Sequence, residues 1–165
     1  MVNVTVEPAP IEEKSILRNM LQLYIHDLSE FAGFDLDAYG IYGYRYLDFY
    51  WVEDGRYPLL VRVDGQLAGF VFIRGEDLAS SPRYSVAEFF IMRKFRRHGI
   101  GETVARQVFE RFPGRWSLAV DLRKQPGLPF WRKVVGAFTH GHFAERPGDS
   151  AHRIVLEFTM TDSAA

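Results

Sequence analysis

Hydrophobic and polar positions alternate along the first third of the chain with two different periods. Val2, Val4 and Val6 repeat at every second residue, which predicts a short strand that the following prolines end. The apolar positions then follow the repeat of an amphipathic helix that Gly33 closes, and its stripe consists of Leu17, Leu21, Tyr24, Leu28 and Phe31. The aromatic segment 39–51 predicts a loop and leaves open a second short helix.

The middle of the chain changes to a strand-like pattern. Two β-rich runs within residues 58–75 flank Asp64-Gly65, which predicts a hairpin because glycine accepts the positive φ of a tight turn. A third strand is predicted at 84–92. An amphipathic helix follows and ends at Pro113-Gly114, and its apolar face consists of Val104, Ala105, Val108, Phe109 and Phe112.

The last third predicts one helix and three strands. The helix carries FWRKVV, begins near Pro126 and Pro129, and ends at Gly136. The last two strands are expected to pair antiparallel across the connection ERPGDSA. The three predicted strands cover residues 116–120, 137–144 and 152–160.

The predicted order is β-α-(α)-β-β-β-α-β-α-β-β. It indicates an α/β fold with a mixed, mostly antiparallel central sheet and flanking helices. The chain has 165 residues, of which 47% are hydrophobic and 25% charged, values typical of a globular protein. We therefore expect a single domain over residues 1–165 with a substantial core.

The net charge and the residue composition exclude several classes of function. The formal net charge of -1 provides no overall field to recruit nucleic acid or an anionic membrane. The absence of cysteine excludes disulfides, thiolate metal sites and a cysteine nucleophile. The start, MVNVTVEPAP, lacks a basic region before an apolar one, and no run reaches eighteen apolar residues. We expect a soluble, cytoplasmic protein.

The segment EFFIMRKFRRHGIGETVARQVFERF, residues 88–112, carries the most specific chemistry. An apolar run meets a basic cluster and two glycines, Gly99 and Gly101, at a strand-to-helix junction. Glycines allow a tight turn, and the first turn of a helix offers unpaired N–H groups and a positive dipole end. This combination predicts a site for a pyrophosphate. The Walker pattern is absent, and the dinucleotide pattern lacks its third glycine.

Residues 96–101, RRHGIG, fit the Arg/Gln-x-x-Gly-x-Gly/Ala signature, and the chain resembles the GNAT superfamily of N-acetyltransferases. The motif follows a long strand and precedes an amphipathic helix, and LPFWRKVVGAF at 128–138 resembles a later motif of that family. The resemblance covers the whole element order. It implies the GNAT-like fold, acetyl-CoA as donor, and direct transfer in a ternary complex to a primary amine of a small molecule or peptide. Related enzymes are often dimers.

The resemblance also implies which residues hold the donor. The main chain of Ile91, Met92 and Arg93 would pair with the pantetheine arm at a splay in the sheet, and Phe130 and Trp131 would pack beside it. The alternatives are a solvated basic turn with a glycine cap and, for Phe130, a place in the helix core. The pyrophosphate cradle would consist of Arg96, Arg97, His98, Gly99, Ile100, Gly101 and Glu102.

Glu88 is the candidate general base that would deprotonate the attacking amine. It alternates with Val86 and Phe90, so desolvation on an apolar face would raise its pKa toward neutrality. Members of the resembled family often place a glutamate on this strand. The alternatives are a carboxylate on a solvent-filled face and a paired structural residue. Backbone N–H groups near Ile91 would donate hydrogen bonds to the thioester oxygen.

Two positions depart from the pattern of the resembled family. Trp131 occupies the position of a tyrosine that often protonates the leaving thiolate, and an indole N–H is too weak an acid for that role. The thiolate would then take its proton from another group or from solvent. Lys124 and Gln125 stand where many relatives have an asparagine that bonds the pantetheine, so that contact is in doubt.

The remaining candidate site residues occur in less specific sequence patterns. His140 and His142 would point the same way on a predicted strand, but with His152 they lack carboxylate or cysteine partners at metal-ligand spacing, so we expect no metal. The His26-Asp27 pair would contact an acceptor or lie on a solvated helix face. The aromatic segment 39–51 would line the acceptor site or form a packed loop or dimer contact.

Two other function classes remain open from the sequence. A non-catalytic module that binds acyl-CoA and reports it to a partner is the first: the missing tyrosine agrees with it, and Glu88 argues against it. Nucleic-acid binding through RKFRRH is disfavoured by the near-neutral charge and by the glycine turn beside the cluster.

Overall fold

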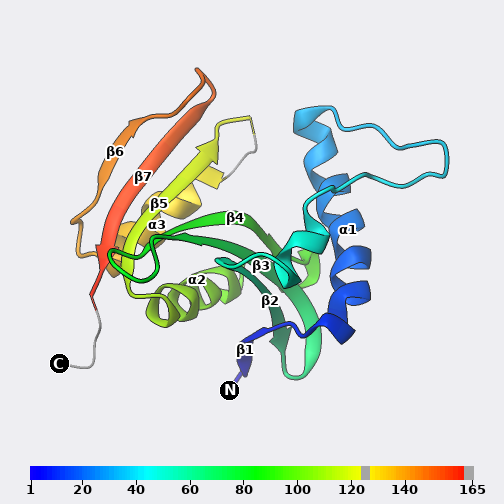
Figure 1. The fold of residues 1–165 in the computed structure, drawn as a ribbon, viewed down its shortest axis with the longest axis horizontal. Helices are drawn as coiled ribbons and strands as arrows, with labels where there is room; N and C mark the ends of the chain where they lie inside the picture. Colours follow the sequence, from blue (N-terminus) through cyan, green and yellow to red (C-terminus); the bar gives the residue numbers. More distant parts are fainter. Residues whose placement is uncertain (124–126, 162–165) are drawn as a thin grey trace.

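The computed structural model describes residues 1–123 and 127–161 and contains a seven-stranded sheet of order β1-β2-β3-β4-β5-β7-β6 (Figure 1). Neighbouring strands are antiparallel except for the parallel pair β4 and β5. The mixed, mostly antiparallel sheet with flanking helices is confirmed. The strands are β1 (Val4–Pro8), β2 (Arg56–Val63), β3 (Gln66–Glu76), β4 (Arg83–Ile91), β5 (Gly114–Asp121), β6 (Ala144–Pro147) and β7 (Arg153–Met160).

The α-helices cover opposite faces of this sheet. The predicted amphipathic pattern produces α1 (Lys14–Ala32), which ends at Gly33 in a left-handed conformation with φ 65°. The other two are α2 (Ile100–Arg111) and α3 (Gly127–Phe138). Three short 3-10 helices complete the fold: η1 (Ile11–Glu13), η2 (Leu47–Trp51) and η3 (Arg93–Phe95).

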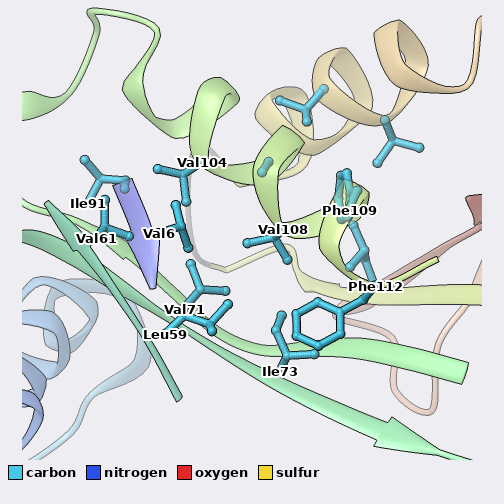
Figure 2. Packing of buried hydrophobic residues seen from close by; sticks show 14 of the residues in the cluster. Val6, Leu59, Val61, Val71, Ile73, Ile91, Val104, Val108, Phe109 and Phe112 are labelled. Atoms are coloured by element: carbon cyan, nitrogen blue, oxygen red, sulfur yellow. The ribbon is translucent and has the colours of Figure 1, made fainter. Parts of the chain in front are cut away.

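Two apolar clusters hold the layers together. In the larger cluster, Val104, Val108 and Phe109 of α2 pack on alternate residues of the sheet, including Val71 and Ile73 of β3 (Figure 2). In the smaller cluster, α1 and η2 pack on the intervening residues, such as Phe70 and Phe72. The β2–β3 hairpin contributes to both clusters because successive strand side chains point to opposite faces. Its predicted turn is confirmed at Asp64-Gly65, with φ 50° and 80°.

A splay divides the sheet at its parallel pair. The pairing of β4 with β5 covers only Arg83–Ser85 against Arg115–Ser117. Beyond that point β4 continues to Ile91 beside β3, while β5 continues beside β7, and the two strands diverge (Figure 1). From residue 86 onward, this edge of β4 therefore has no pairing with β5, and we call this part of the strand the open part of β4.

The end of α3 differs from the prediction. Gly136 lies inside the helix, which continues to Phe138, and the Gly141 N–H donates to the Gly136 carbonyl at 2.9 Å. This bond closes the helix in a turn that contains His140 with φ 50°. The expected strand at 137–144 is therefore wrong, and β6 occupies the segment that was expected to be the connection.

Candidate active site

Glu88 lies on the sheet face covered by α1, as its alternation with Phe90 predicts, but a bulge places Val86 on the opposite face. In the β3–β4 pairing, Phe72 is opposite Glu88 and Ile73 is opposite Val86, so Ala87 is an extra residue in β4. Such a bulge reverses the alternation of side chains. Val86 therefore packs against the α2–α3 cluster, and the expectation that it shares a face with Glu88 is wrong.

Tyr24 of α1 contacts Glu88 directly. Its hydroxyl donates to Glu88 Oε2 at 2.5 Å, and its ring packs on Phe70 and Phe90, each 5.5 Å away between centroids. Burial raises the pKa of Tyr24 well above its usual value, and the charge and hydrogen bond of Glu88 raise it further. The tyrosine therefore keeps its proton and holds the carboxylate in one orientation.

A cleft of about 560 Å³ opens beside this pair. One wall comes from α1 and the residues just after it, and the other from the loop before η2. Glu88 lies between the two walls. The lining consists of Tyr24, Ile25, Leu28, Phe34, Gly43, Tyr44, Arg45, Tyr46 and Glu88. This volume lies within the range of small-molecule sites.

Some residues of the aromatic segment 39–51 line the cleft, and others are packed in the core. Tyr44 and Tyr46 line the cleft, with ring centroids 6.0 Å apart. Tyr50 is instead buried in the core, 4.4 Å from the ring of Phe72. Burial raises the pKa of Tyr44, and the charge of Glu88 acts in the same direction, so this phenol also stays protonated.

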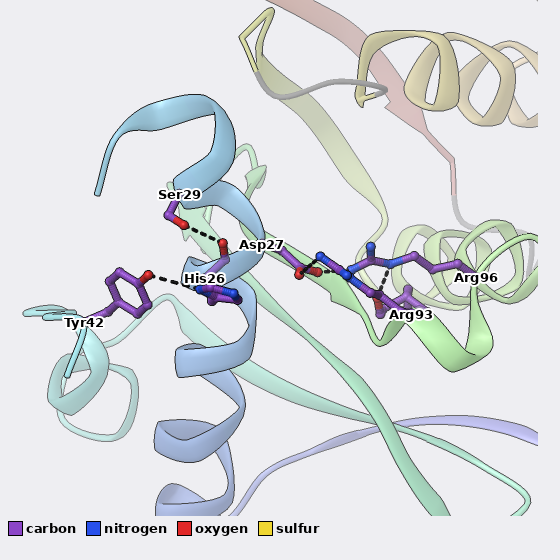
Figure 3. A network of polar contacts seen from close by, with 7 residues as sticks. His26, Asp27, Ser29, Tyr42, Arg93 and Arg96 are labelled. Atoms are coloured by element: carbon purple, nitrogen blue, oxygen red, sulfur yellow. Dashed lines mark hydrogen bonds and ion pairs between the residues drawn. The ribbon is translucent and has the colours of Figure 1, made fainter. Parts of the chain in front are cut away.

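The loop that carries Tyr44 is fixed to α1. The Gln22 side chain donates to the Tyr42 carbonyl and accepts from the Tyr42 N–H, both at 2.8 Å. His26 Nδ1 lies 3.2 Å from the Tyr42 hydroxyl (Figure 3). His26 therefore supports the wall of the cleft from outside and is absent from its lining among the residues the structure describes.

The predicted phosphate turn leads into the first turn of α2 through two residues with positive φ. Arg97 and Gly99 have φ values of 63° and 75°, and Gly99 caps α2. The Thr103 N–H donates to the Gly99 carbonyl at 3.0 Å. The three preceding amides, those of Ile100, Gly101 and Glu102, belong to the first turn, whose N–H groups have no intrahelical acceptor. They form the positive end of the α2 dipole.

Gly101 lies inside α2 and allows close packing against α3. A Cβ at this position would lie 3.3 Å from the Phe130 ring and 3.9 Å from Ile91 Cγ1. Phe130 in turn stands 5.8 Å from the ring of Phe89, and Trp131 stands 5.0 Å from it. Both aromatic residues are half-buried and lie between the turn and the open part of β4.

The motif suggests that Arg96 belongs to the pyrophosphate cradle, but its side chain contacts Asp27 and the main chain of Ile91. Its Nη2 donates to Asp27 Oδ2 at 2.5 Å, and its Nε donates to the Ile91 carbonyl at 2.7 Å. Arg93 donates to the other Asp27 oxygen at 2.8 Å (Figure 3). Asp27 is thus a bridge from α1 to the turn, and Arg96 braces the end of β4. In the described part of the chain, Arg97 makes no ion pair.

Replacing Asp27 by asparagine should lower the free energy of unfolding at pH 7 by about 1 kcal/mol, since the arginines are partly exposed. Burial alone would raise the Asp27 pKa, but the hydrogen bonds from Arg96 and Arg93 outweigh it and lower the pKa. The stabilisation is therefore complete above the usual aspartate pKa and is lost as the pH falls through the lower, folded-state value. Urea unfolding of the wild type and the variant, at one pH above the usual aspartate pKa and one below the folded-state value, measures this stabilisation. A difference in the free energy of unfolding that does not change with pH would contradict the role given to the Asp27 ion pairs.

The main chain at the end of β4 is partly engaged within the protein. The Met92 N–H donates to the Ala68 carbonyl at 2.8 Å, and the Ile91 carbonyl accepts from Arg96. Pairing of a pantetheine arm with Ile91, Met92 and Arg93 therefore stays a prediction. Lys124 and Gln125 lie outside the described residues.

The remaining candidates do not gather into a site. His140 and His142 lie in the turn after α3 rather than on a strand. Within residues 1–123 and 127–161, no three histidine, aspartate or glutamate side chains are grouped to hold a metal ion. No helix in the same residues is long and apolar enough to cross a membrane.

Known proteins share this architecture. The structural neighbours include PaiA N-acetyltransferase from Thermoplasma acidophilum in complex with coenzyme A, with 14% identity, a TM-score of 0.60, and coverage of 95% of this chain and 99% of that one. An acetyltransferase from Thermus thermophilus has 17% identity and a TM-score of 0.62, covering 96% and 97%. Arabidopsis thaliana Naa50 with the bisubstrate analogue CoA-Ac-MVNAL has 13% identity and a TM-score of 0.59, covering 95% and 99%.

The sequence comparisons complete the assignment. No curated protein matches the chain. The model of the acetyltransferase (GNAT) family matches residues 19–137. That match includes most of α1, the cleft, Glu88, the glycine turn and most of α3, which are the parts of the molecule described above. The chain belongs to the GNAT family of acetyltransferases.

Proposed function

We propose that this acetyltransferase moves the acetyl group of acetyl-CoA to a primary amine of a small molecule or peptide by direct attack in a ternary complex. One observation carries the proposal. Glu88 faces the cleft between α1 and the loop before η2, on the part of β4 that has left β5. An amine in the cleft and a donor along the open strand would thus meet at one carboxylate.

The donor would be held by the turn before α2. The amides of Ile100, Gly101 and Glu102 would bind its pyrophosphate with the exposed Arg97 and His98, whereas Arg96 would act through Asp27 and Ile91 as a brace. Two neighbours support a donor of this class, because their structures contain coenzyme A and a CoA-peptide bisubstrate analogue.

Glu88 would take a proton from the amine as its nitrogen attacks the thioester carbonyl carbon. The C–N bond forms, the C–S bond breaks, and the electron pair leaves on sulfur. Tyr24 would orient the carboxylate through its 2.5 Å hydrogen bond. Backbone N–H groups of the open strand would stabilise the charge that develops on the carbonyl oxygen.

The leaving thiolate would take its proton from solvent. Trp131 cannot supply one. Tyr24 and Tyr44 are the phenols next to Glu88 in the cleft, and both have raised pKa values because they are buried beside its charge. Since a raised pKa makes a phenol a weaker acid, neither is suited to the role that a tyrosine plays in related enzymes.

Calorimetric titration with acetyl-CoA and with acetyl-pantetheine tests the donor site. We expect acetyl-CoA to bind about 30-fold or more tightly, because charge-assisted hydrogen bonds to the pyrophosphate contribute about 2 kcal/mol in total. Equal affinities would show that the turn is only a helix cap. No binding of either compound would overturn acetyl-CoA as the donor.

A further inference from the structure

The lining of the acceptor cleft includes one cationic and one anionic side chain on a mostly apolar surface. Among the nine described residues that line it, Arg45 supplies the only cation and Glu88 the only carboxylate. The others are three tyrosines, a phenylalanine, two aliphatic residues and a glycine. A ligand that matches this lining has an amine, an apolar body and an anionic group.

We propose that Arg45 selects acceptors that carry a carboxylate, and that the substrate class is the apolar or aromatic α-amino acid. This inference rests on the proposed function, since it assigns the amine end of the acceptor to Glu88. The carboxylate would meet the guanidinium of Arg45, and the side chain would lie on Tyr44, Ile25 and Leu28.

Arg45 is held in place without being neutralised. Its Nη2 donates to the Tyr46 hydroxyl at 2.5 Å, and its guanidinium lies 4.8 Å from the centroid of the same ring. A guanidinium has five N–H donors, so this bond leaves others for a ligand. Within residues 1–123 and 127–161, Arg45 is in no ion pair, whereas Arg93 and Arg96 share Asp27.

The loop beneath Arg45 is ordered before any acceptor arrives. Two hydrogen bonds join Tyr42 to Gln22 of α1, which also carries Tyr24 and thereby contacts Glu88. The loop that carries Arg45 and the carboxylate of Glu88 therefore both contact α1. A loop that is already ordered reduces the conformational entropy that would be lost when an acceptor binds.

The charge arrangement also disfavours other amines. A planar guanidinium can bind a carboxylate through two parallel hydrogen bonds. A diamine would place its second cation against Arg45 and be repelled. A simple monoamine would leave the guanidinium without its anion, so it would lose the contribution that an amino acid gains.

Binding to the protein, with and without saturating coenzyme A, tests this directly. Calorimetry would compare L-phenylalanine, L-leucine and L-methionine with phenethylamine, isoamylamine and 3-(methylthio)propylamine, their counterparts without the carboxylate. We expect at least one amino acid to bind about tenfold or more tightly than its own amine. Arg45→Met should reduce that preference to about threefold or less, and Arg45→Lys should keep part of it because lysine retains the charge.

Arg18→Met is the matched control. Arg18 is an exposed cation that lines the neighbouring hollow of about 340 Å³, which Arg45 also lines, but not this cleft, so its loss should leave the preference intact. The proposal is overturned if no amino acid binds more tightly than its amine, if the preference survives in Arg45→Met, or if none of the six compounds binds. Failure of acetyl-CoA to bind would instead remove the proposed donor, and the titrations without coenzyme A would still decide the role of Arg45.

Discussion

Replacing Glu88 by glutamine should lower kcat/KM for acetyl transfer by about 10²- to 10⁴-fold, the usual contribution of a positioned base, and leave the affinity for acetyl-CoA unchanged. Glutamine has nearly the same size and can still accept the hydrogen bond from Tyr24. It cannot take the proton of the amine. Thiol release in the presence of an amine measures the rate, and calorimetry measures donor binding.

Glu110→Gln provides the comparison for this experiment. Glu110 lies on the exposed side of α2, so its replacement removes the same charge away from the cleft and should leave the rate unchanged. A Glu88→Gln enzyme with the wild-type rate would remove Glu88 from the mechanism. A parallel loss of acetyl-CoA affinity would show that the carboxylate supports the fold of the donor site instead.

Replacing Phe109 by alanine should lower the free energy of unfolding by about 3–5 kcal/mol. The side chain is 1% exposed and joins three elements to α2. Its ring lies 5.0 Å from that of Trp116 in β5, 5.1 Å from Phe158 in β7 and 5.8 Å from Phe138 in α3. The truncation leaves a cavity where these elements meet, and urea unfolding measures the loss.

The position of Phe109 also connects stability to the donor site. Trp131, which packs beside Phe89 at the open strand, is 6.4 Å from the Phe109 ring. Phe31→Ala makes the same truncation at a side chain that is 41% exposed and should change the free energy of unfolding by less than about 0.5 kcal/mol. A Phe109→Ala loss as small as that of Phe31→Ala would contradict the packing described here.

Local patterns were sufficient to predict most of the sheet and helices. The period-2 and period-3.6 repeats placed β1, the β2–β3 hairpin, α1 and α2 because each element buries one regular face. The end of α3 was wrong because Gly136 resembles a stop signal. In the structure Gly136 lies inside the helix, and a Cβ at this position would lie 3.7 Å from the Phe143 ring, an ordinary van der Waals contact. A glycine within a helix is indistinguishable in sequence from one that ends a helix.

The site was predictable only where its residues are close together in sequence. The glycine turn and Glu88 stand out in the sequence because a short motif and one strand contain them, and their roles stay predictions. Tyr24 was assigned to the apolar stripe of α1, and its contact with Glu88 joins residues 64 positions apart. The bulge at Ala87 depends on the pairing with β3, so alternation along β4 alone misplaced Val86. Such features arise from tertiary contacts and leave no local signal.

The Asp27 bridge gives both halves of the site a common support. Tyr24 and Asp27 lie one turn apart on α1, and one reaches Glu88 while the other holds Arg93 and Arg96. A ligand that drew the arginines away from Asp27 would loosen the helix that presents Tyr24. Coupling free energies between two binding sites are reciprocal. An acceptor that needs Tyr24 in place would therefore weaken the binding of such a ligand by the same factor by which the ligand weakens the binding of the acceptor.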